Sequence, residues 1–265
     1  MSFAVVTVHF QNPPSTRRLF GDLEDCESVL SIFVISHDSF RMEHRGKVVC
    51  FQQPNKGYAS GLNFGVKQLP AEIHTVLAVN PDVILDCEKV KSLYSQHLAS
   101  GAGCTFPVLT EKGRPVYGYR FSSFGSLLNT KDPEWFSGAC FLFSVEAWQK
   151  TGGFDESFFH YFEDRDFCLR VRKAGFKLHQ AVDVFVEHEG KSGENYPETS
   201  LPKFAVKNHL LALERSELLG PLSFVNVVLR HFLYLFRWKK AWRGIPEWLK
   251  GIREFLTHTE STVVE

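Results

Sequence analysis

The sequence lacks several features that would assign the protein to a class at once. It has 30 basic and 30 acidic residues, so its formal net charge is zero and no overall field favours nucleic acid as a partner. No apolar run is long enough to span a bilayer. No basic leader precedes residues 3–10, which we expect to form a strand and not a signal peptide. With 265 residues, 44% of them hydrophobic, the chain is long enough for a large globular domain with or without an appendage.

Paired cysteine motifs are also missing. The six cysteines are scattered singly, without the CxxC spacing of zinc or redox sites, and several lie in apolar runs. We therefore predict that they are reduced core residues of a cytoplasmic protein and that they form no disulfide framework. They are Cys26, Cys50, Cys87, Cys104, Cys140 and Cys168.

Short apolar, β-branched runs alternate with helix-length connections in the first third of the chain. This alternation predicts an α/β fold, with a parallel sheet flanked by helices and ligands bound at the carboxyl ends of the strands. The predicted strands are residues 3–10, 29–35, 47–51 and 75–79. Polar or glycine-rich motifs follow these strands, so we expect the motifs to meet at one edge of the sheet.

Two of these motifs can be interpreted either as ligand-binding elements or as purely structural ones. Residues 55–65 are rich in glycine but have neither the GxGxxG spacing nor the lysine of a P-loop. Gly57 and Gly61 would let the backbone approach a ligand at a helix N-terminus, or they belong to a turn followed by a packed helix. The Asn-Pro-Asp sequence at 80–82 is either a turn or a carboxylate placed to hold a divalent ion at a strand end.

An acidic cluster precedes a helical pattern in the second half of the chain. Glu163, Asp164 and Asp166 start a predicted helix that Gly175 ends. There the macrodipole and the free N–H groups favour ionised carboxylates, which suits a group that accepts a proton near neutral pH. For a helix taken alone, a capping role would be the better interpretation.

Taken in order, these motifs resemble glycosyltransferase family 2, whose members are inverting nucleotide-sugar enzymes of the GT-A fold, and most of all its bacterial rhamnosyltransferases. The resemblance covers roughly residues 3–210. The matching segments are N-x-G-Y-A-x-G-x-N-x-G at 55–65, N-P-D at 80–82, W-F-S-G-A at 135–139, G-G-F-D-E at 152–156, E-D-x-D at 163–166 and H-x-G-x-S at 188–192. The resemblance implies a GT-A catalytic domain, a mixed sheet flanked by helices, over residues 1–202. A C-terminal helical segment would follow over residues 203–265.

The resemblance also implies a role for each candidate residue. A divalent ion, Mg²⁺ or Mn²⁺, would bridge the donor's diphosphate and be held by Asp82 and His188, although His188 could instead be a surface histidine. Asp164 would be the catalytic base that takes the proton of the acceptor hydroxyl, with Asp166 as the close alternative and Glu163 beside them. The donor-binding positions would be Phe10, Ser36, Asn55, Gly57, Gly61, Asn63 and Asn80.

Two donor positions depart from the family pattern. Ser36 stands where the family usually has an Asp that reads the imide of uracil or thymine, so the base of the donor stays open. Phe10 lies in a His-Phe-Gln sequence that replaces a commoner Asn-Tyr-Asn, and it would either stack on the donor or be a buried aromatic residue.

The composition changes towards the C-terminus, where residues 221–255 combine aromatic, aliphatic and basic side chains. Such an amphipathic segment suits the surface of an anionic membrane, and the alternative is a helical lid or a dimer contact. The family resemblance implies transfer of a sugar, with L-rhamnose from dTDP-rhamnose as the implied donor, to a glycan or lipid-linked acceptor at the cytoplasmic face of the inner membrane. The alternative function is a catalytically silent nucleotide-sugar or carbohydrate-binding domain on the same fold.

Overall fold

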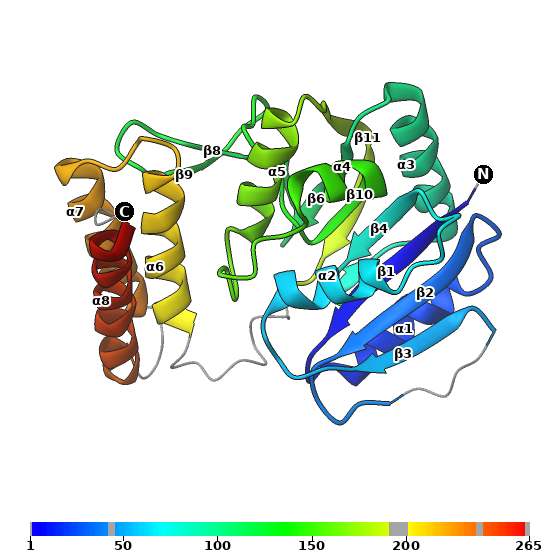
Figure 1. Ribbon diagram of the computed structural model, residues 1–265, viewed down its shortest axis with the longest axis horizontal. Helices are drawn as coiled ribbons and strands as arrows, with labels where there is room; N and C mark the ends of the chain where they lie inside the picture. Colours follow the sequence, from blue (N-terminus) through cyan, green and yellow to red (C-terminus); the bar gives the residue numbers. More distant parts are fainter. Residues whose placement is uncertain (1, 42–45, 191–200, 237–240, 263–265) are drawn as a thin grey trace.

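The computed structural model, drawn in Figure 1, describes residues 2–41, 46–190, 201–236 and 241–262. Within these residues a nine-stranded mixed sheet forms the centre of the molecule, in the order β3-β2-β1-β4-β10-β6-β11-β5, with β7 paired to β6. The strands of this sheet are β1 (Phe3–His9), β2 (Val29–Ser36), β3 (Val48–Gln52), β4 (Thr75–Val79), β5 (Val83–Ile84), β6 (Cys104–Glu111), β7 (Arg114–Val116), β10 (Cys140–Ser144) and β11 (Leu178–His188).

The four strands predicted from the sequence are present and pair in parallel, within one or two residues of the predicted ends. β10 then runs antiparallel between β4 and β6, which makes the sheet mixed. All seven residues of β1 are buried. Adjacent residues such as Val5 and Val6 point to opposite faces of the sheet and belong to two different hydrophobic clusters. The continuous apolar run therefore reflects a strand that is covered on both faces.

Helices cover both faces of the sheet. In the cluster that contains Val6, α2, α4 and α5 contribute residues such as Leu62 and Phe167. In the cluster that contains Val5, α1 and α3 contribute residues such as Leu19. These helices are α1 (Pro13–Leu23), α2 (Tyr58–Lys67), α3 (Cys87–Ser100), α4 (Val145–Thr151) and α5 (Glu163–Lys173). The predicted α/β class with a mixed sheet is confirmed.

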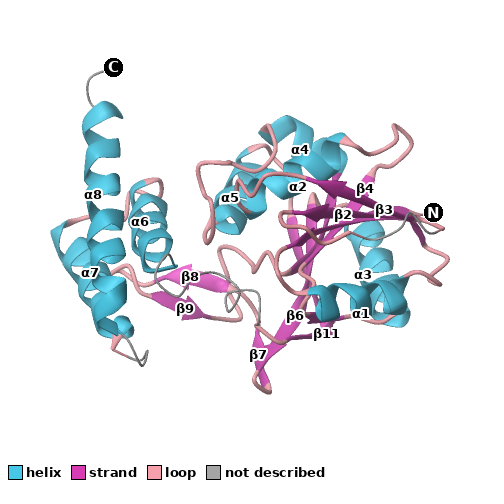
Figure 2. Ribbon diagram, turned by 90° about the horizontal axis from the view of Figure 1, so that it is seen from below, coloured by secondary structure: helices cyan, strands magenta, loops and turns pink. Residues whose placement is uncertain are grey.

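The C-terminal helices pack on one another at one end of the molecule (Figure 1). They are α6 (Leu201–Glu214), α7 (Pro221–Leu235) and α8 (Ile245–Thr262), with the short 3₁₀ helix η2 (Ala241–Gly244) before α8. Leu210 of α6 belongs to the same hydrophobic cluster as Phe167 of α5. The hairpin of β8 (Tyr119–Phe121) and β9 (Leu127–Asn129) extends towards these helices (Figure 2), and the Asn226 side chain donates a hydrogen bond to the carbonyl of Phe124, 2.7 Å away. The division of the chain at residue 202 stays a prediction.

The cysteine prediction is wrong in one respect, because Cys26 and Cys87 form a disulfide with Cα atoms 5.5 Å apart. Cys26 precedes β2 and Cys87 begins α3, so only the folded chain brings together two residues that are 61 positions apart. The other cysteines are free, and Cys104, Cys140 and Cys168 are buried as predicted. The disulfide removes the cysteine argument for a reducing compartment.

Among the described helices, none combines the length and the apolar composition needed to cross a bilayer. The aromatic and basic residues Trp238, Lys239 and Lys240 lie outside the described residues.

Candidate active site

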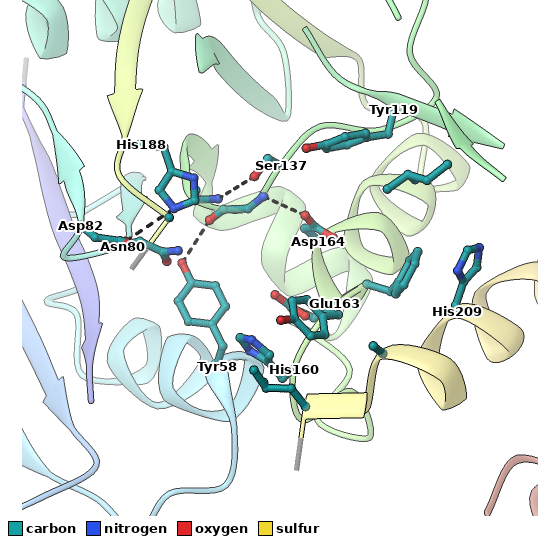
Figure 3. Close-up of a pocket in the computed structure, with 18 of the residues that line it drawn as sticks. Tyr58, Asn80, Asp82, Tyr119, Ser137, His160, Glu163, Asp164, His188 and His209 are labelled. Atoms are coloured by element: carbon teal, nitrogen blue, oxygen red, sulfur yellow. Dashed lines mark hydrogen bonds and ion pairs between the residues drawn. The ribbon is translucent and has the colours of Figure 1, made fainter. Parts of the chain in front are cut away.

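A cavity of about 1140 Å³ opens between the carboxyl ends of the central strands and the C-terminal helices (Figure 3). Six predicted site residues line it: Phe10, Asn80, Asp82, Glu163, Asp164 and His188. Six others do not line it: Ser36, Asn55, Gly57, Gly61, Asn63 and Asp166. The structure therefore brings the predicted metal ligands and two of the three predicted acids to one cavity.

Asp82 and His188 meet at the edge of the sheet. The Asn-Pro-Asp sequence forms a turn after β4, in which the Val83 N–H donates to the Asn80 carbonyl at 3.1 Å and the Asp82 side chain is buried. His188 is the last residue of β11 and is paired with Val83 across the antiparallel β5–β11 contact. This pairing places Nε2 of His188 3.6 Å from Oδ1 of Asp82.

A second acid, Glu111, contacts the other ring nitrogen of His188. Nδ1 of His188 lies 2.9 Å from Oε1 of Glu111, at the end of β6. Burial lowers the pKa of His188, but the hydrogen bonds and charges of Asp82 and Glu111 outweigh it and raise the pKa to about 9. The ring is thus an imidazolium at neutral pH, and its charge is balanced by the two carboxylates.

A divalent ion fits the chemistry of this pair. Carboxylate oxygen and neutral imidazole nitrogen are both ligands for Mn²⁺ or Mg²⁺, so His188 would give up its Nε2 proton when the ion binds, and Glu111 would hold the ring through Nδ1. Nε2 of His188 and Oδ1 of Asp82 are 3.6 Å apart, which is less than twice a metal–ligand bond of about 2.1 Å, so both atoms could reach one ion. Within the described residues no group of three or more His, Cys, Asp or Glu side chains is arranged to hold a metal. Asp82 and His188 would therefore supply two ligands, and a diphosphate and water the others.

Asp164 faces the same cavity from the first turn of α5. Its Oδ2 accepts the Gly138 N–H at 2.8 Å, and its Oδ1 accepts the N–H of Arg165 at 2.7 Å (Figure 3). A Cβ on Gly138 would lie 2.9 Å from Cβ of Asp164, which explains a glycine at this position of the W-F-S-G-A segment. Burial raises the pKa of Asp164, and the two backbone N–H groups oppose that rise because they stabilise the carboxylate.

Glu163 lies beside Asp164 but has a different hydrogen-bonding environment. Its side chain is buried, and among the described residues Oε2 has no hydrogen-bond partner. Burial, followed by repulsion from Asp164, raises the pKa of Glu163 to about 8. Of the two neighbouring acids, Asp164 is therefore the better-stabilised carboxylate, because it accepts two backbone N–H groups while Oε2 of Glu163 accepts none among the described residues.

The turn that presents these acids is strained. Tyr161 and Phe162 both have φ of 69°, a left-handed conformation that costs of order 1–3 kcal/mol for each residue other than glycine. Asn208 of α6 clamps this turn, because its side-chain amide donates to the carbonyls of His160 at 2.7 Å and Tyr161 at 3.2 Å. A residue of the C-terminal helices therefore helps to position Glu163 and Asp164.

Asp166 points away from the cavity into an ion-pair network. Its carboxylate accepts hydrogen bonds from Arg170 and from Arg215, each at 2.7 Å. Arg215, which follows α6, also contacts Asp155 of the G-G-F-D-E segment at 2.8 Å. Asp166 thus joins α5 to the chain around it, whereas Asp164 is the member of the pair that reaches the cavity.

Most of the glycine-rich motif, residues 55–65, packs within the protein and does not line the cavity. A Cβ on Gly57, which has φ of 97°, would lie 2.8 Å from Cα of Phe159, and a Cβ on Gly61 would lie 2.7 Å from the Val8 side chain. The Asn63 side chain is buried and makes four hydrogen bonds, all within the protein, that join α2 to the G-G-F-D-E segment and to Trp148. Asn55 accepts the Gly57 N–H at 3.1 Å. These residues stabilise the turn and helix on which the cavity is built.

Ser36 and its neighbours form a closed polar group at the end of β2. The Ser36 hydroxyl donates to the carboxylate of Asp38 at 3.1 Å, and that carboxylate also accepts the N–H groups of Gln11 and Phe40. The carboxylate of Asp38 also lies 3.4 Å from the buried imidazole of His9. The end of β2 thus presents an acid, Asp38, two positions after the place where the family pattern has one.

Comparison with known proteins identifies the family. The model of "Glycosyltransferase like family 2" matches residues 88–210. The low-salt glycan biosynthesis hexosyltransferase Agl10 of Haloferax volcanii is 30% identical over 150 residues, which is 51% of this chain and 49% of that protein. The matched segment, residues 88–210, belongs to glycosyltransferase family 2.

Other matches fit this family-2 assignment. The rhamnosyltransferase WbbL of Escherichia coli is 27% identical over 138 residues, which is 43% of this chain and 51% of WbbL. The chain therefore spans about half the length of the curated relatives that it matches. The crystal structure of GalNAc-T7 with UDP, GalNAc and Mn²⁺ has a TM-score of 0.64 at 15% identity, covering 81% of this chain and 48% of that one, which shows the GT-A fold.

Several residues at the site were not found from the sequence. Tyr58, whose hydroxyl donates to the Gly138 carbonyl at 3.1 Å, stands inside the glycine-rich motif, so that motif could have indicated it. Glu111 and Asn208 are single polar residues in segments without a recognised motif. The same holds for His209 and His231, which line the cavity from α6 and α7. Only the packing of the C-terminal helices brings His209 and His231 to the cavity and Asn208 to the turn before Glu163.

Proposed function

We propose that the protein is an inverting glycosyltransferase that moves a sugar from a nucleoside-diphosphate sugar to a hydroxyl of a glycan or lipid-linked acceptor. The observation that carries the proposal is that one cavity contains both halves of this chemistry. Asp82 and His188 lie 3.6 Å apart in the lining of this cavity, and Asp164 faces the same cavity from the start of α5. GalNAc-T7, which shares the fold, has UDP, GalNAc and Mn²⁺ in its crystal structure.

The donor end would be organised by the strand edges. Asp82 and His188 would hold a divalent ion, which when bound supplies positive charge to the departing diphosphate. Phe10 and Asn80 line the same part of the cavity and would contact the nucleotide. The similarity to WbbL, a rhamnosyltransferase by name, supports L-rhamnose from dTDP-rhamnose as the donor.

The acceptor hydroxyl would lose its proton to Asp164. Two backbone N–H groups fix the orientation of this carboxylate, so it is already placed before substrates bind. Burial raises the pKa of Glu163 beside it to about 8, so Asp164, with its two N–H donors, is the acid that would accept the proton. As the acceptor oxygen attacks the anomeric carbon, its proton would move to Asp164, while the bond to the diphosphate breaks on the opposite face and the configuration inverts.

A screen of nucleotide sugars tests the proposal. One donor should raise the thermal stability in the presence of Mn²⁺, because a ligand at 100 times its Kd adds about 2.7 kcal/mol to the free energy of unfolding. The same donor should then release its nucleoside diphosphate when glycosides are supplied as acceptors. Donor binding without release for any glycoside would instead support the catalytically silent binding domain.

The C-terminal helices suggest where the enzyme works. α7 carries an apolar stripe, defined as Leu222, Val225, Leu229 and Leu233, in which each side chain is more than half exposed. These positions follow a spacing of three or four residues, so they share one face of the helix. Two exposed basic residues, Lys250 and Arg253, lie on α8, which packs against α7. We propose that this stripe contacts an anionic membrane surface, where a lipid-linked acceptor would be available.

Serine at all four stripe positions is expected to lower the fraction of protein that sediments with anionic liposomes by at least about tenfold. Each exposed Leu or Val loses the transfer energy of its apolar surface, about 1.5–3 kcal/mol when fully buried. Wild-type sedimentation should require anionic lipid and weaken with salt. The matched control is serine at Leu98 and Val182, which are also exposed but lie on α3 and β11. Equal sedimentation of wild type and stripe variant would favour a packed lid, and a concentration-dependent dimer lost in the variant would favour a dimer contact.

A further inference from the structure

The cavity has a second end, beyond Asp164, that the proposed chemistry does not assign. It is formed by α6 and α7, which contribute His209, Arg230, His231 and Tyr234 to the lining. These residues, apart from His209, lie beyond the segment 88–210 that matches the family model. A hydrogen bond joins the rings of His209 and His231, and a second one joins His209 to a backbone carbonyl. Together these bonds fix which nitrogen of each ring carries the proton.

The first of these residues, His209, is buried. Its ring stacks on that of Phe121, with centroids 5.2 Å apart, and lies tilted against that of Phe162, with centroids 5.0 Å apart. Its Nε2 lies 2.8 Å from the carbonyl oxygen of Gly125 in the β8–β9 hairpin. A carbonyl oxygen only accepts hydrogen bonds, so Nε2 of His209 must carry a proton. Burial, followed by repulsion from His231, lowers the pKa of His209 to about 3, so the ring is neutral and its Nδ1 is a lone-pair acceptor.

The second histidine, His231, donates the next hydrogen bond in this series. Its Nε2 lies 3.1 Å from Nδ1 of His209, so Nε2 must be the donor. Burial, followed by the charge of Arg230, lowers the pKa of His231 to about 4. The ring is therefore neutral as well, and Nδ1 of His231 carries a lone pair.

This nitrogen is available to a ligand. In the described part of the chain no group donates to Nδ1 of His231, and this atom is not among the buried polar atoms that lack a partner. His231 and Arg230 both line the cavity, so the structure offers a hydrogen-bond acceptor of fixed tautomer and a guanidinium donor to a ligand bound there. Aromatic rings of Tyr119 and Trp135 line the same cavity, and such rings are suitable surfaces for the apolar face of a sugar.

We propose that Nδ1 of His231 accepts a hydrogen bond from a hydroxyl of the acceptor sugar, and that Arg230 donates to a neighbouring oxygen of the same sugar. This inference rests on the proposed glycosyl transfer, because Asp82 and His188 assign the other end of the cavity to the donor. It makes α7 part of the acceptor subsite, and it makes His231 a residue that determines which acceptor is used.

Deoxy-sugar acceptors test the inference. A panel of octyl glycosides identifies an acceptor of the wild-type enzyme, and monodeoxy versions of that glycoside then remove one hydroxyl at a time. The substitution His231→Phe should raise the KM for the parent glycoside about tenfold with a much smaller change in the donor KM, since a lost hydrogen bond is worth about 1–1.5 kcal/mol. For one deoxy glycoside, wild type and His231→Phe should perform alike, because the hydroxyl and its partner act as a pair. His231→Gln, which keeps an N–H donor and an oxygen acceptor, should recover part of the affinity.

The controls separate this inference from the proposed function. His179→Phe changes a histidine of β11 that does not line the cavity, and it should leave the KM for the glycoside unchanged. If every deoxy glycoside loses the same amount in wild type and in His231→Phe, His231 only joins α6 to α7. If the wild type releases no nucleotide with any donor and glycoside, the proposed function fails first, and the subsite fails with it. A nitrogen-15 correlation spectrum gives a readout without activity: protonated Nδ1 and unprotonated Nε2 in His231 would overturn the assignment.

Discussion

The substitution Asp164→Asn is expected to lower kcat by about 10² to 10⁴ while the donor KM changes little. General-base catalysis is typically worth that much in rate, and Asn has the size of Asp without its proton affinity. The amide oxygen can still accept the N–H of Gly138 or Arg165, so the first turn of α5 should keep its place. Steady-state kinetics with varied donor, together with a thermal melt, measures both effects.

Its two acidic neighbours provide matched controls. Glu163→Gln resembles the protonated form of Glu163, so we expect a loss of kcat much smaller than for Asp164→Asn. Asp166→Asn should weaken the ion pairs with Arg170 and Arg215 and lower the melting temperature more than it lowers kcat. If Asp166→Asn is inactive as a folded protein while Asp164→Asn turns over normally, the two aspartates exchange roles.

The pH dependence of stability tests the charge state of Glu163. Its pKa is raised in the folded protein from 4.5 to about 8, so the folded state holds this proton more tightly than the unfolded state does. The corresponding stability is fully present below about pH 4.5 and is lost as the pH rises to about 8. Chemical unfolding across this range should therefore give a smaller slope for Glu163→Gln than for the wild type.

The sequence was most informative where one element alone determines the pattern. The buried strands, the start of α5 at Glu163 and the turn around Asp82 follow from local apolar periodicity and from the polar residues that interrupt it. Because parallel strands end at one edge of a sheet, the same reasoning placed Asp82 at the ligand-binding edge, and the family resemblance joined Asp164 to it. It could not separate Asp164 from Asp166, since the difference depends on Arg215 and the Gly138 N–H, which lie far away in the chain.

What the sequence did not predict depends on contacts between distant elements. Glu111 matters only because β6 and β11 are neighbours, Asn208 only because α6 lies against the turn before α5, and His231 only because α7 lines the cavity. The pair of Cys26 and Cys87 likewise follows from how the turn before β2 meets the start of α3. For the glycine-rich motif the sequence left two interpretations open, and the close approach of Gly57 to Phe159 supports a packing role, while its donor-binding role stays a prediction.

Removal of the Asp82 carboxylate should uncouple donor binding from the divalent ion. In the wild type, calorimetry should give a much higher donor affinity with Mn²⁺ than with EDTA, because the ion would join the diphosphate to Asp82 and His188. Asp82→Asn should reduce the affinity in Mn²⁺ to the level seen in EDTA, since a buried amide replaces the only charged oxygen ligand of the pair. Glu111→Gln is the graded comparison: it leaves both ligands in place but weakens the hold on Nδ1 of His188, and loss of such support typically costs 10- to 100-fold in metal affinity. If the donor affinity of the wild type is the same in Mn²⁺ and EDTA, and Asp82→Asn leaves it unchanged, the ion has no place in the mechanism and the imidazolium of His188 itself would have to stabilise the departing diphosphate.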